Sequence, residues 1–196
     1  MFGAPFPGAS ARAAYNGSAS GIPPSVPFSF TLGFGAEDPG RIVVIALTML
    51  AALDAGSVTI GGVTATKVAS GSGSNCFAEL WAALVPTGPS GTVTVNGTST
   101  FPRVALSSYA IYGGGLAPRS SLSNTGGAIA SSGVVLGAEV GINNNTTWGG
   151  VSSDFSTSLL SGSVPIFLNA ASFPAQAPSS LSVSATNFAA LCFAGW

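Results

Sequence analysis

Histidine is absent from the 196 residues of the chain, and charge of either sign is scarce. Without an imidazole, the chain has no Ser-His-Asp or Cys-His nucleophile arrangement and no histidine ligand for zinc. Charged residues make up 6% of the chain, against roughly 25% in an average soluble protein. The net charge of −1 offers no basic patch, which argues against nucleic acid or an anionic membrane as partner. We expect neighbouring subunits to cover so neutral a surface.

Signatures of catalysis and of metal binding are also missing. No Ser-x-x-Lys, Gly-x-Ser-x-Gly or Walker motif occurs, and no Asp-x-Asp pattern indicates calcium. A glycosidase needs two carboxylates across a cleft, and the chain has six acidic residues to offer. Any two of these acidic residues could meet in the fold, but turn and capping roles are favoured for four of the six. We therefore predict that the chain is not an enzyme and has no cofactor and no metal. The acidic residues assigned to turns are Glu37, Asp38, Asp54 and Asp154.

Two cysteines and one glutamate stand in apolar surroundings. Cys76 and Cys192 each lie in a Cys-Phe-Ala context. Buried free thiols are favoured over a disulfide, because a core of this size needs no cross-link. Glu79 lies inside an apolar strand, where an ion pair with Lys67 or Arg103 on an adjacent strand is favoured over a catalytic role.

The longest apolar run is too short to cross a membrane as a helix. It extends from residue 42 to residue 53, about a dozen residues, whereas a spanning helix needs roughly 20. Within it, residues 41–50 (RIVVIALTML) are rich in β-branched side chains and have no polar face. This pattern predicts a strand buried on both sides, at the centre of a sheet that other layers cover.

The rest of the chain reads as many short strands separated by turns. Alternation of apolar and polar residues begins at residue 26, and turn sequences such as Gly61-Gly62 and Asn96-Gly97 follow. Ten or more short strands with turns at this spacing are typical of a sandwich or barrel. We predict an all-β fold, a single two-sheet jelly-roll-like β-sandwich over residues 26–196. The expected strands are residues 26–34, 41–50, 57–60, 63–69, 76–85, 92–96, 103–112, 134–142, 146–151, 164–172, 181–186 and 188–196.

Residues 1–25 differ in composition from everything that follows. Proline, glycine, alanine and serine dominate this segment, and no hydrophobic period is sustained. We predict an extended N-terminal arm that cannot build a core of its own and needs a surface to lie on. Phe2 and Phe6 are the candidate contact residues of this arm. Its first residues lack the basic start and apolar stretch of a secretory signal.

The aromatic residues raise a binding alternative. Trp148 stands beside a polar loop formed by Asn143, Asn144 and Asn145, so its ring could offer a sugar platform with amide hydrogen bonds nearby. Core packing is favoured for Trp81 and Trp196, which fall on expected strands.

Several stretches resemble a family of small β-rich proteins from phages and prophages of alphaproteobacteria. The matching residues are 41–46, 58–66, 80–95 and 109–113, with a looser match over residues 147–155. These are strand-and-turn patterns rather than catalytic signatures, so the resemblance implies a shared fold more firmly than a shared role. It implies a virion component of the capsid-decoration, fibre or tail type, and no catalytic residue carries over.

The leading hypothesis is therefore a phage virion structural protein, a capsid decoration, cement or head-fibre component that binds the capsid lattice. Its partners would be the major capsid protein or other virion proteins, and it would form a homo-oligomer. It would reside in the virion, which is assembled in the cytoplasm of the bacterial host. The alternative is a carbohydrate-binding or receptor-binding module of a tail or fibre, with a host glycan as ligand.

Overall fold

The computed structural model describes residues 11–51, 54–97, 103–131, 133–142, 147–161, 164–173, 179–186 and 188–196. Every strand pairing within these ranges is antiparallel, and the predicted all-β class is confirmed. The described part of the chain contains no helix that is long and apolar enough to cross a membrane.

The described strands form four sheets, which we name A to D. Sheet A has the order β1 (Arg12–Gly21), β9 (Arg103–Tyr112), β3 (Ile42–Leu50), β7 (Cys76–Leu84), β6 (Thr66–Gly73). Sheet B has the order β2 (Phe28–Gly33), β8 (Ser90–Gly97), β4 (Ala55–Ile60), β5 (Val63–Thr64). Sheet C has the order β10 (Ser120–Ser123), β17 (Phe188–Gly195), β12 (Val135–Ile142), β15 (Val164–Phe173), β14 (Ser152–Ser161). Sheet D has the order β11 (Gly127–Ser131), β16 (Ser179–Thr186), β13 (Thr147–Gly149).

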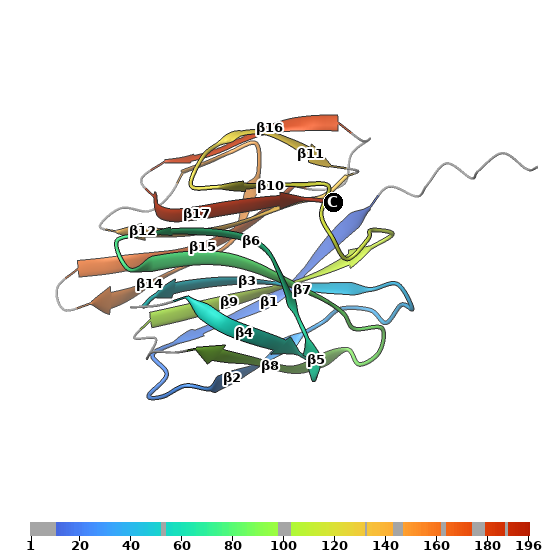
Figure 1. The fold of residues 1–196 in the computed structure, drawn as a ribbon, viewed down its shortest axis with the longest axis horizontal. Coiled ribbons are helices and arrows are strands. Elements are labelled where there is room, and N and C mark those ends of the chain that lie inside the picture. Colours follow the sequence, from blue (N-terminus) through green and yellow to red (C-terminus); the bar gives the residue numbers. More distant parts are fainter. Residues whose placement is uncertain are drawn as a thin grey trace, which may run out of the picture.

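The sheets are stacked in the sequence B, A, C, D, with an apolar core between each neighbouring pair (Figure 1). The core between sheets A and C is built from alanine, leucine and valine side chains of both sheets. A second core lies between A and B, and a smaller one lies between C and D. Sheets A and C are therefore covered on both faces, while B and D each keep one outer face.

Strand β3 is buried on both sides, as its apolar sequence predicts. Val44 and Ala46 point into the core shared with sheet C, whereas Val43 and Ile45 point into the core shared with sheet B. This alternation is the period of two expected for a strand, applied to two apolar environments at once. The run of residues 41–50 thus supplies the central strand of a four-layer stack.

The strand order of the first half of the chain recurs in the second half. Strands β1, β9, β3, β7 and β6 of sheet A correspond in turn to β10, β17, β12, β15 and β14 of sheet C. Strands β2, β8 and β4 of sheet B correspond to β11, β16 and β13 of sheet D, and β5 has no counterpart. Where we expected one two-sheet sandwich, the chain therefore forms two consecutive sandwiches of the same strand order. The reason is that each half closes its own pair of sheets before the chain moves on.

The two sandwiches face each other through sheets A and C in an approximately two-fold arrangement. Strand β3 lies on its own counterpart β12. The contact of β7 with β17 is matched by β15 with β9, and the contact of β6 with β10 is matched by β14 with β1. Each contact thus recurs with the roles of the two halves exchanged, as in a symmetric dimer.

One side of this seam depends on glycine. A Cβ atom added at Gly71 would overlap the carbonyl of Leu191, and one at Gly73 would overlap the carbonyl of Ala189. Strand β6 therefore lies with its backbone directly on β17. Asn124 fixes the same place, because its side chain donates to the Ser72 carbonyl at 2.7 Å and accepts from the Leu191 amide at 3.1 Å.

Part of the segment expected as an arm is a strand of the fold. Residues 12–21 form β1, which pairs with β9 from Arg12↔Tyr112 to Gly21↔Val104, with a register shift between Tyr15 and Ser18. The prediction of an extended arm over residues 1–25 is therefore corrected for residues 12–21, where main-chain pairing with β9 replaces the missing hydrophobic period. Residues 1–10 lie outside the described residues.

Candidate functional site

The surface of the molecule carries even less charge than the composition implies. Three of the eleven charged side chains, Arg41, Glu79 and Glu139, are fully buried, so eight are left for the surface. Burial of three charges requires internal partners, because an unpaired buried charge is strongly unfavourable.

Arg41, just before β3, is held by backbone carbonyl groups. Its Nε donates to the carbonyl of Val85 at 2.7 Å. Its two terminal nitrogens donate to four more carbonyls, at 2.8 to 3.1 Å. All five N–H donors of the guanidinium are thus used, and two loops far apart in sequence are fixed to one side chain. The four carbonyls belong to Gly35, Ala36, Thr87 and Gly88.

A shallow depression of about 300 Å³ lies between these two loops, lined by Glu37, Asp38, Pro39, Pro86 and Thr87. Its two carboxylates already accept backbone hydrogen bonds, since the Gly88 amide donates to Glu37 and the Gly40 amide donates to Asp38, both at 2.7 Å. This is the turn role predicted for Asp38, whereas Glu37 links its own loop to the distant loop that contains Gly88. Their hydrogen bonds hold the rim of the depression together.

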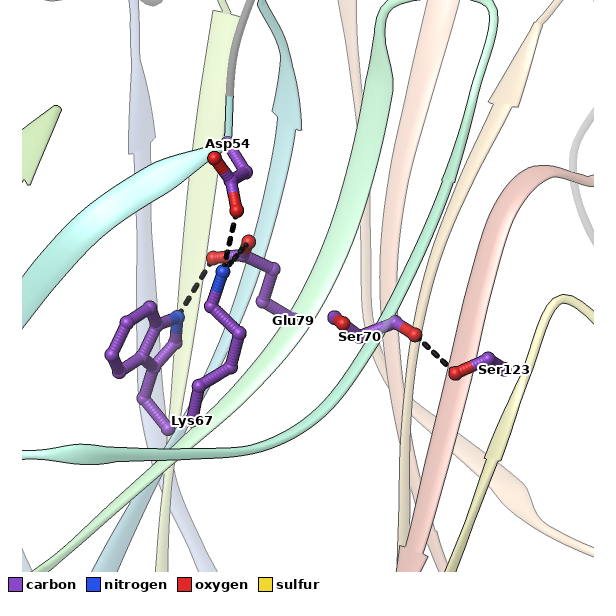
Figure 2. A network of polar contacts seen from close by, with 6 residues as sticks. Asp54, Lys67, Ser70, Glu79 and Ser123 are labelled. Atoms are coloured by element: carbon purple, nitrogen blue, oxygen red, sulfur yellow. Dashed lines mark hydrogen bonds and ion pairs between the residues drawn. The ribbon is translucent and has the colours of Figure 1, made fainter. Parts of the chain in front are cut away.

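Glu79 is the centre of a polar cluster in sheet A (Figure 2). Lys67 Nζ lies 2.8 Å from Glu79 Oε1 and 2.7 Å from Asp54 Oδ2, and Trp81 Nε1 donates to Glu79 Oε2 at 2.8 Å. The ammonium group also sits 5.0 Å from the centroid of the Trp81 ring. The predicted pairing of Glu79 with Lys67 is confirmed. Asp54 joins the same cation, which the turn assignment for this residue did not anticipate.

The two central groups of this cluster have shifted pKa values. Burial raises the pKa of Glu79, and the hydrogen bonds from Lys67 and Trp81 offset only part of that increase. For Lys67, partial burial lowers the pKa, but the hydrogen bonds and charges of Asp54 and Glu79 outweigh it, so the pKa is raised above 10.5. Both carboxylates bind one ammonium, and Glu79 is fully buried. The cluster therefore ties β6 and β7 to the segment before β4.

The third buried charge, Glu139, and the two cysteines are also enclosed within the fold. Asn169 Nδ2 donates to Glu139 Oε2 across the paired strands β12 and β15. Cys76 and Cys192 are buried free thiols, as predicted. Burial raises the pKa of Cys76 to about 11 and also raises that of Cys192, which keeps both thiols protonated near neutral pH. Within the described ranges, no three acidic or cysteine side chains come together as a metal site would need.

Trp148, the proposed surface aromatic, is half-buried in the core between sheets C and D. Its ring meets Phe193 in an edge-to-face contact, with centroids 5.8 Å apart. A Cβ atom at Gly137 would approach this ring to 3.1 Å, so the tryptophan also packs over the backbone of β12. The other candidate contact residues, Phe2, Phe6 and the Asn143 to Asn145 loop, lie outside the described residues.

The outer face of sheet B is a neutral surface lined with hydroxyl groups, and we did not single it out from the sequence. Three neighbouring strands each present a Ser/Thr-x-Ser/Thr pattern whose middle residue is apolar and points inward. The cross-strand register aligns Ser29 with Thr94 and Thr94 with Thr59, and the Ser29 and Thr94 hydroxyls are 2.8 Å apart. The sequence signal that could have identified this face is the period-two alternation of hydroxyl and apolar residues along the three strands. The hydroxyl face comprises Ser29, Thr31, Ser57, Thr59, Thr92 and Thr94.

Comparison of the chain with protein-family models, with curated proteins and with solved structures gives no match. The resemblance to phage and prophage proteins therefore stays a prediction.

Proposed function

We propose that the chain is a virion structural protein of a bacteriophage, a capsid decoration, cement or head-fibre component that binds the capsid lattice. The observation that carries this proposal is the nearly uncharged surface, with the hydroxyl face of sheet B as its most regular part. Eight charged side chains are few for a freely dissolved protein of this size, since roughly 25–35% of surface residues are usually charged. A neutral face can be buried against a partner without removing ions from water.

The topology fits the same proposal. In each sandwich the first strand pairs with the last, and the third lies next to the last, as in two nested Greek keys. We infer that each half is a jelly roll, one over strands β1 to β9 and one over β10 to β17. Jelly rolls occur in viral capsid domains and in lectins. Fold alone does not decide between these roles, so the proposal rests on the surface.

The first test mixes purified protein with undecorated capsids and measures co-sedimentation. We expect the wild-type chain to pellet with capsids and Thr92→Lys to pellet less, because the lysine places a charge in the hydroxyl face. Thr125→Lys adds the same charge in the exposed loop between β10 and β11 and is the matched control. Failure of the wild-type chain to co-sediment would contradict the decoration role, and equal loss in both variants would contradict the role of the hydroxyl face.

The arm hypothesis needs a shorter deletion than the sequence suggested. Because β1 begins at Arg12 and pairs along β9, removing residues 1–24 would expose a long stretch of sheet A. Removing residues 1–10 leaves that pairing intact. We propose that this shorter segment, with Phe2 and Phe6, contributes to attachment, so its deletion should reduce co-sedimentation and leave the circular dichroism spectrum unchanged. Undiminished attachment would show that the arm hypothesis is wrong.

The glycan-binding alternative has less support from the described residues. A sugar platform needs an aromatic face open to the ligand, and the Trp148 ring is engaged with Phe193 and with the backbone of β12. A glycan array distinguishes the two roles, because binding to host polysaccharide that is lost in Trp148→Ala would favour the alternative.

A further inference from the structure

Three of the eleven charged residues of the chain meet at one point, on the face of sheet A that is turned toward sheet B. Lys67, the only lysine of the chain, lies between the carboxylates of Asp54 and Glu79 (Figure 2). One cation is enough to pair buried Glu79. The second carboxylate at the same nitrogen, which comes from a different segment of the chain, therefore needs an explanation of its own.

The paired strands β6 and β7 hold the reacting groups in place. Glu79 and Trp81 are two residues apart in β7, so their side chains lie on the same face, and Lys67 of β6 is paired with Trp81. A register shift directly after Lys67 makes Val68 the extra residue of a bulge, a feature that redirects neighbouring side chains. Trp81 Nε1 donates to Glu79 Oε2, which leaves Glu79 Oε1 for the amine, at 2.8 Å.

The amine of Lys67 and the carboxyl group of Asp54 are close enough to react. Well-oriented groups react when the two atoms are roughly 3–3.5 Å apart. Lys67 Nζ lies 2.7 Å from Asp54 Oδ2, so the carboxyl carbon, one bond beyond that oxygen, is beside the nitrogen. Side-chain exposure rises from 1% for Glu79 to 26% for Lys67 and 54% for Asp54. The inner end of the cluster is thus shielded from water, and the outer end is open to solvent.

We propose that Lys67 and Asp54 form an intramolecular isopeptide bond, with Glu79 as the proton carrier. The ammonium group first passes one proton through Glu79 to the Asp54 carboxylate. The lone pair of Nζ then attacks the carboxyl carbon, and the electron pair of the C=O bond moves onto its oxygen. Glu79 takes a second proton from the nitrogen and delivers it to the departing hydroxyl group, so the C–O bond breaks and one water leaves. The products are an amide, water and the restored Glu79 carboxylate.

The surroundings of the cluster favour this proton transfer. Burial raises the pKa of Glu79, so this side chain accepts a proton more readily than an exposed carboxylate does. Partial burial lowers the pKa of Lys67, but its two carboxylate partners raise it above 10.5, so most of the amine is protonated and the bond should form slowly. The reaction needs no oxidant or co-reactant. It would join sheet A covalently to the segment that enters sheet B, and the inference does not depend on the proposed function.

The intact mass of the purified full chain tests the inference. After overnight incubation of the folded protein at neutral pH, we expect a mass lower than the sequence mass by one water. An amine reagent added in denaturant should leave Lys67 unlabelled, and fragment ions from cleavage between residues 54 and 67 should be missing. Asp54→Ala, which lacks the carboxyl group, and Glu79→Gln, which lacks the proton carrier, should each keep the full mass. Glu37→Gln lies outside the cluster, is the matched control and should lose the water as the wild-type chain does.

Full mass in the folded wild-type chain would overturn the inference. A loss of water that leaves Lys67 reactive would indicate a succinimide at Asp54 and would overturn it too, as would the same loss of water in Asp54→Ala or Glu79→Gln. The wild-type measurements need no variant, so they decide the matter even where a variant fails to fold. Because the readout is a covalent mass, its outcome is separate from co-sedimentation with capsids, and either proposal can fail while the other stands.

Discussion

The Tyr109 phenol, buried in sheet A, donates a hydrogen bond of 3.0 Å to the Asp154 carboxylate in sheet C, and so joins the two sandwiches by their side chains. Burial, followed by the charge of Asp154, raises the pKa of Tyr109, so the phenol remains a donor at any physiological pH.

Replacing this phenol should weaken the seam between the sandwiches. Tyr109→Phe leaves the half-buried carboxylate without its donor, and we expect a loss of about 1–2 kcal/mol in the free energy of unfolding. Urea unfolding measures the effect. Tyr15→Phe is the matched control, because the Tyr15 hydroxyl is exposed and bonds to nearby Ser18. In a double-mutant cycle with Asp154→Ala, a coupling energy near zero would contradict the assigned contact.

No other residue should replace Arg41 without a loss in the free energy of unfolding. Lysine keeps the charge but has three donors in place of five, and its point charge cannot reach both loops at once. We expect Arg41→Lys to lower the free energy of unfolding by about 2–4 kcal/mol, as the buried carbonyls lose donors. Arg119→Lys, at an exposed position, should change it by less than about 0.5 kcal/mol. Equal effects of the two substitutions in urea unfolding would show that the carbonyl cage does not stabilise the fold.

Glu79 should make stability depend on pH in a definite direction. Because burial raises its pKa above the ordinary 4.5, the folded chain holds this proton more tightly than the unfolded chain. The stability that this tighter proton binding adds to the folded chain is fully present below pH 4.5. It is lost as the pH rises through the folded pKa of Glu79. Glu79→Gln mimics the protonated side chain and removes this slope. We therefore expect the variant to gain stability relative to wild type as the pH rises from 4.5. A constant difference, in urea unfolding at several pH values, would contradict the raised pKa.

Sequence patterns located strands where apolar residues decide the structure. Strands β3, β7 and β9 lie close to their predicted ranges, because each buries nearly all of its side chains. Strands β1, β10, β11 and β14 were missed because serine, alanine and glycine give no clear period. Their place is set by main-chain pairing with β9, β17, β16 and β15, which composition does not encode.

The order of the sheets and the partners of buried Arg41 could not be predicted from the sequence, for a related reason. An apolar strand indicates that both faces of its sheet are covered, but not which sheet covers each face. The sequence of such a strand therefore does not distinguish one sandwich from two stacked sandwiches. Arg41 marked only the start of an apolar run. Its acceptors are backbone carbonyls from two distant loops, and any residue type can supply those. By contrast, Glu79 was predicted to pair because a lone acid inside an apolar strand requires a cation.

The close approach of β6 to β17 predicts that Gly71 tolerates no side chain. Gly71→Ala would push a Cβ atom into the Leu191 carbonyl, which belongs to rigid main chain and cannot turn aside. We expect a loss of about 1–3 kcal/mol in the free energy of unfolding, typical of an overpacked site, together with faster exchange of the Leu191 amide. Gly127→Ala is the control, since its nearest contact would be 3.8 Å from a leucine side chain. An unchanged unfolding midpoint in Gly71→Ala would mean that β6 does not lie directly on β17, and that the two sandwiches meet less closely on this side.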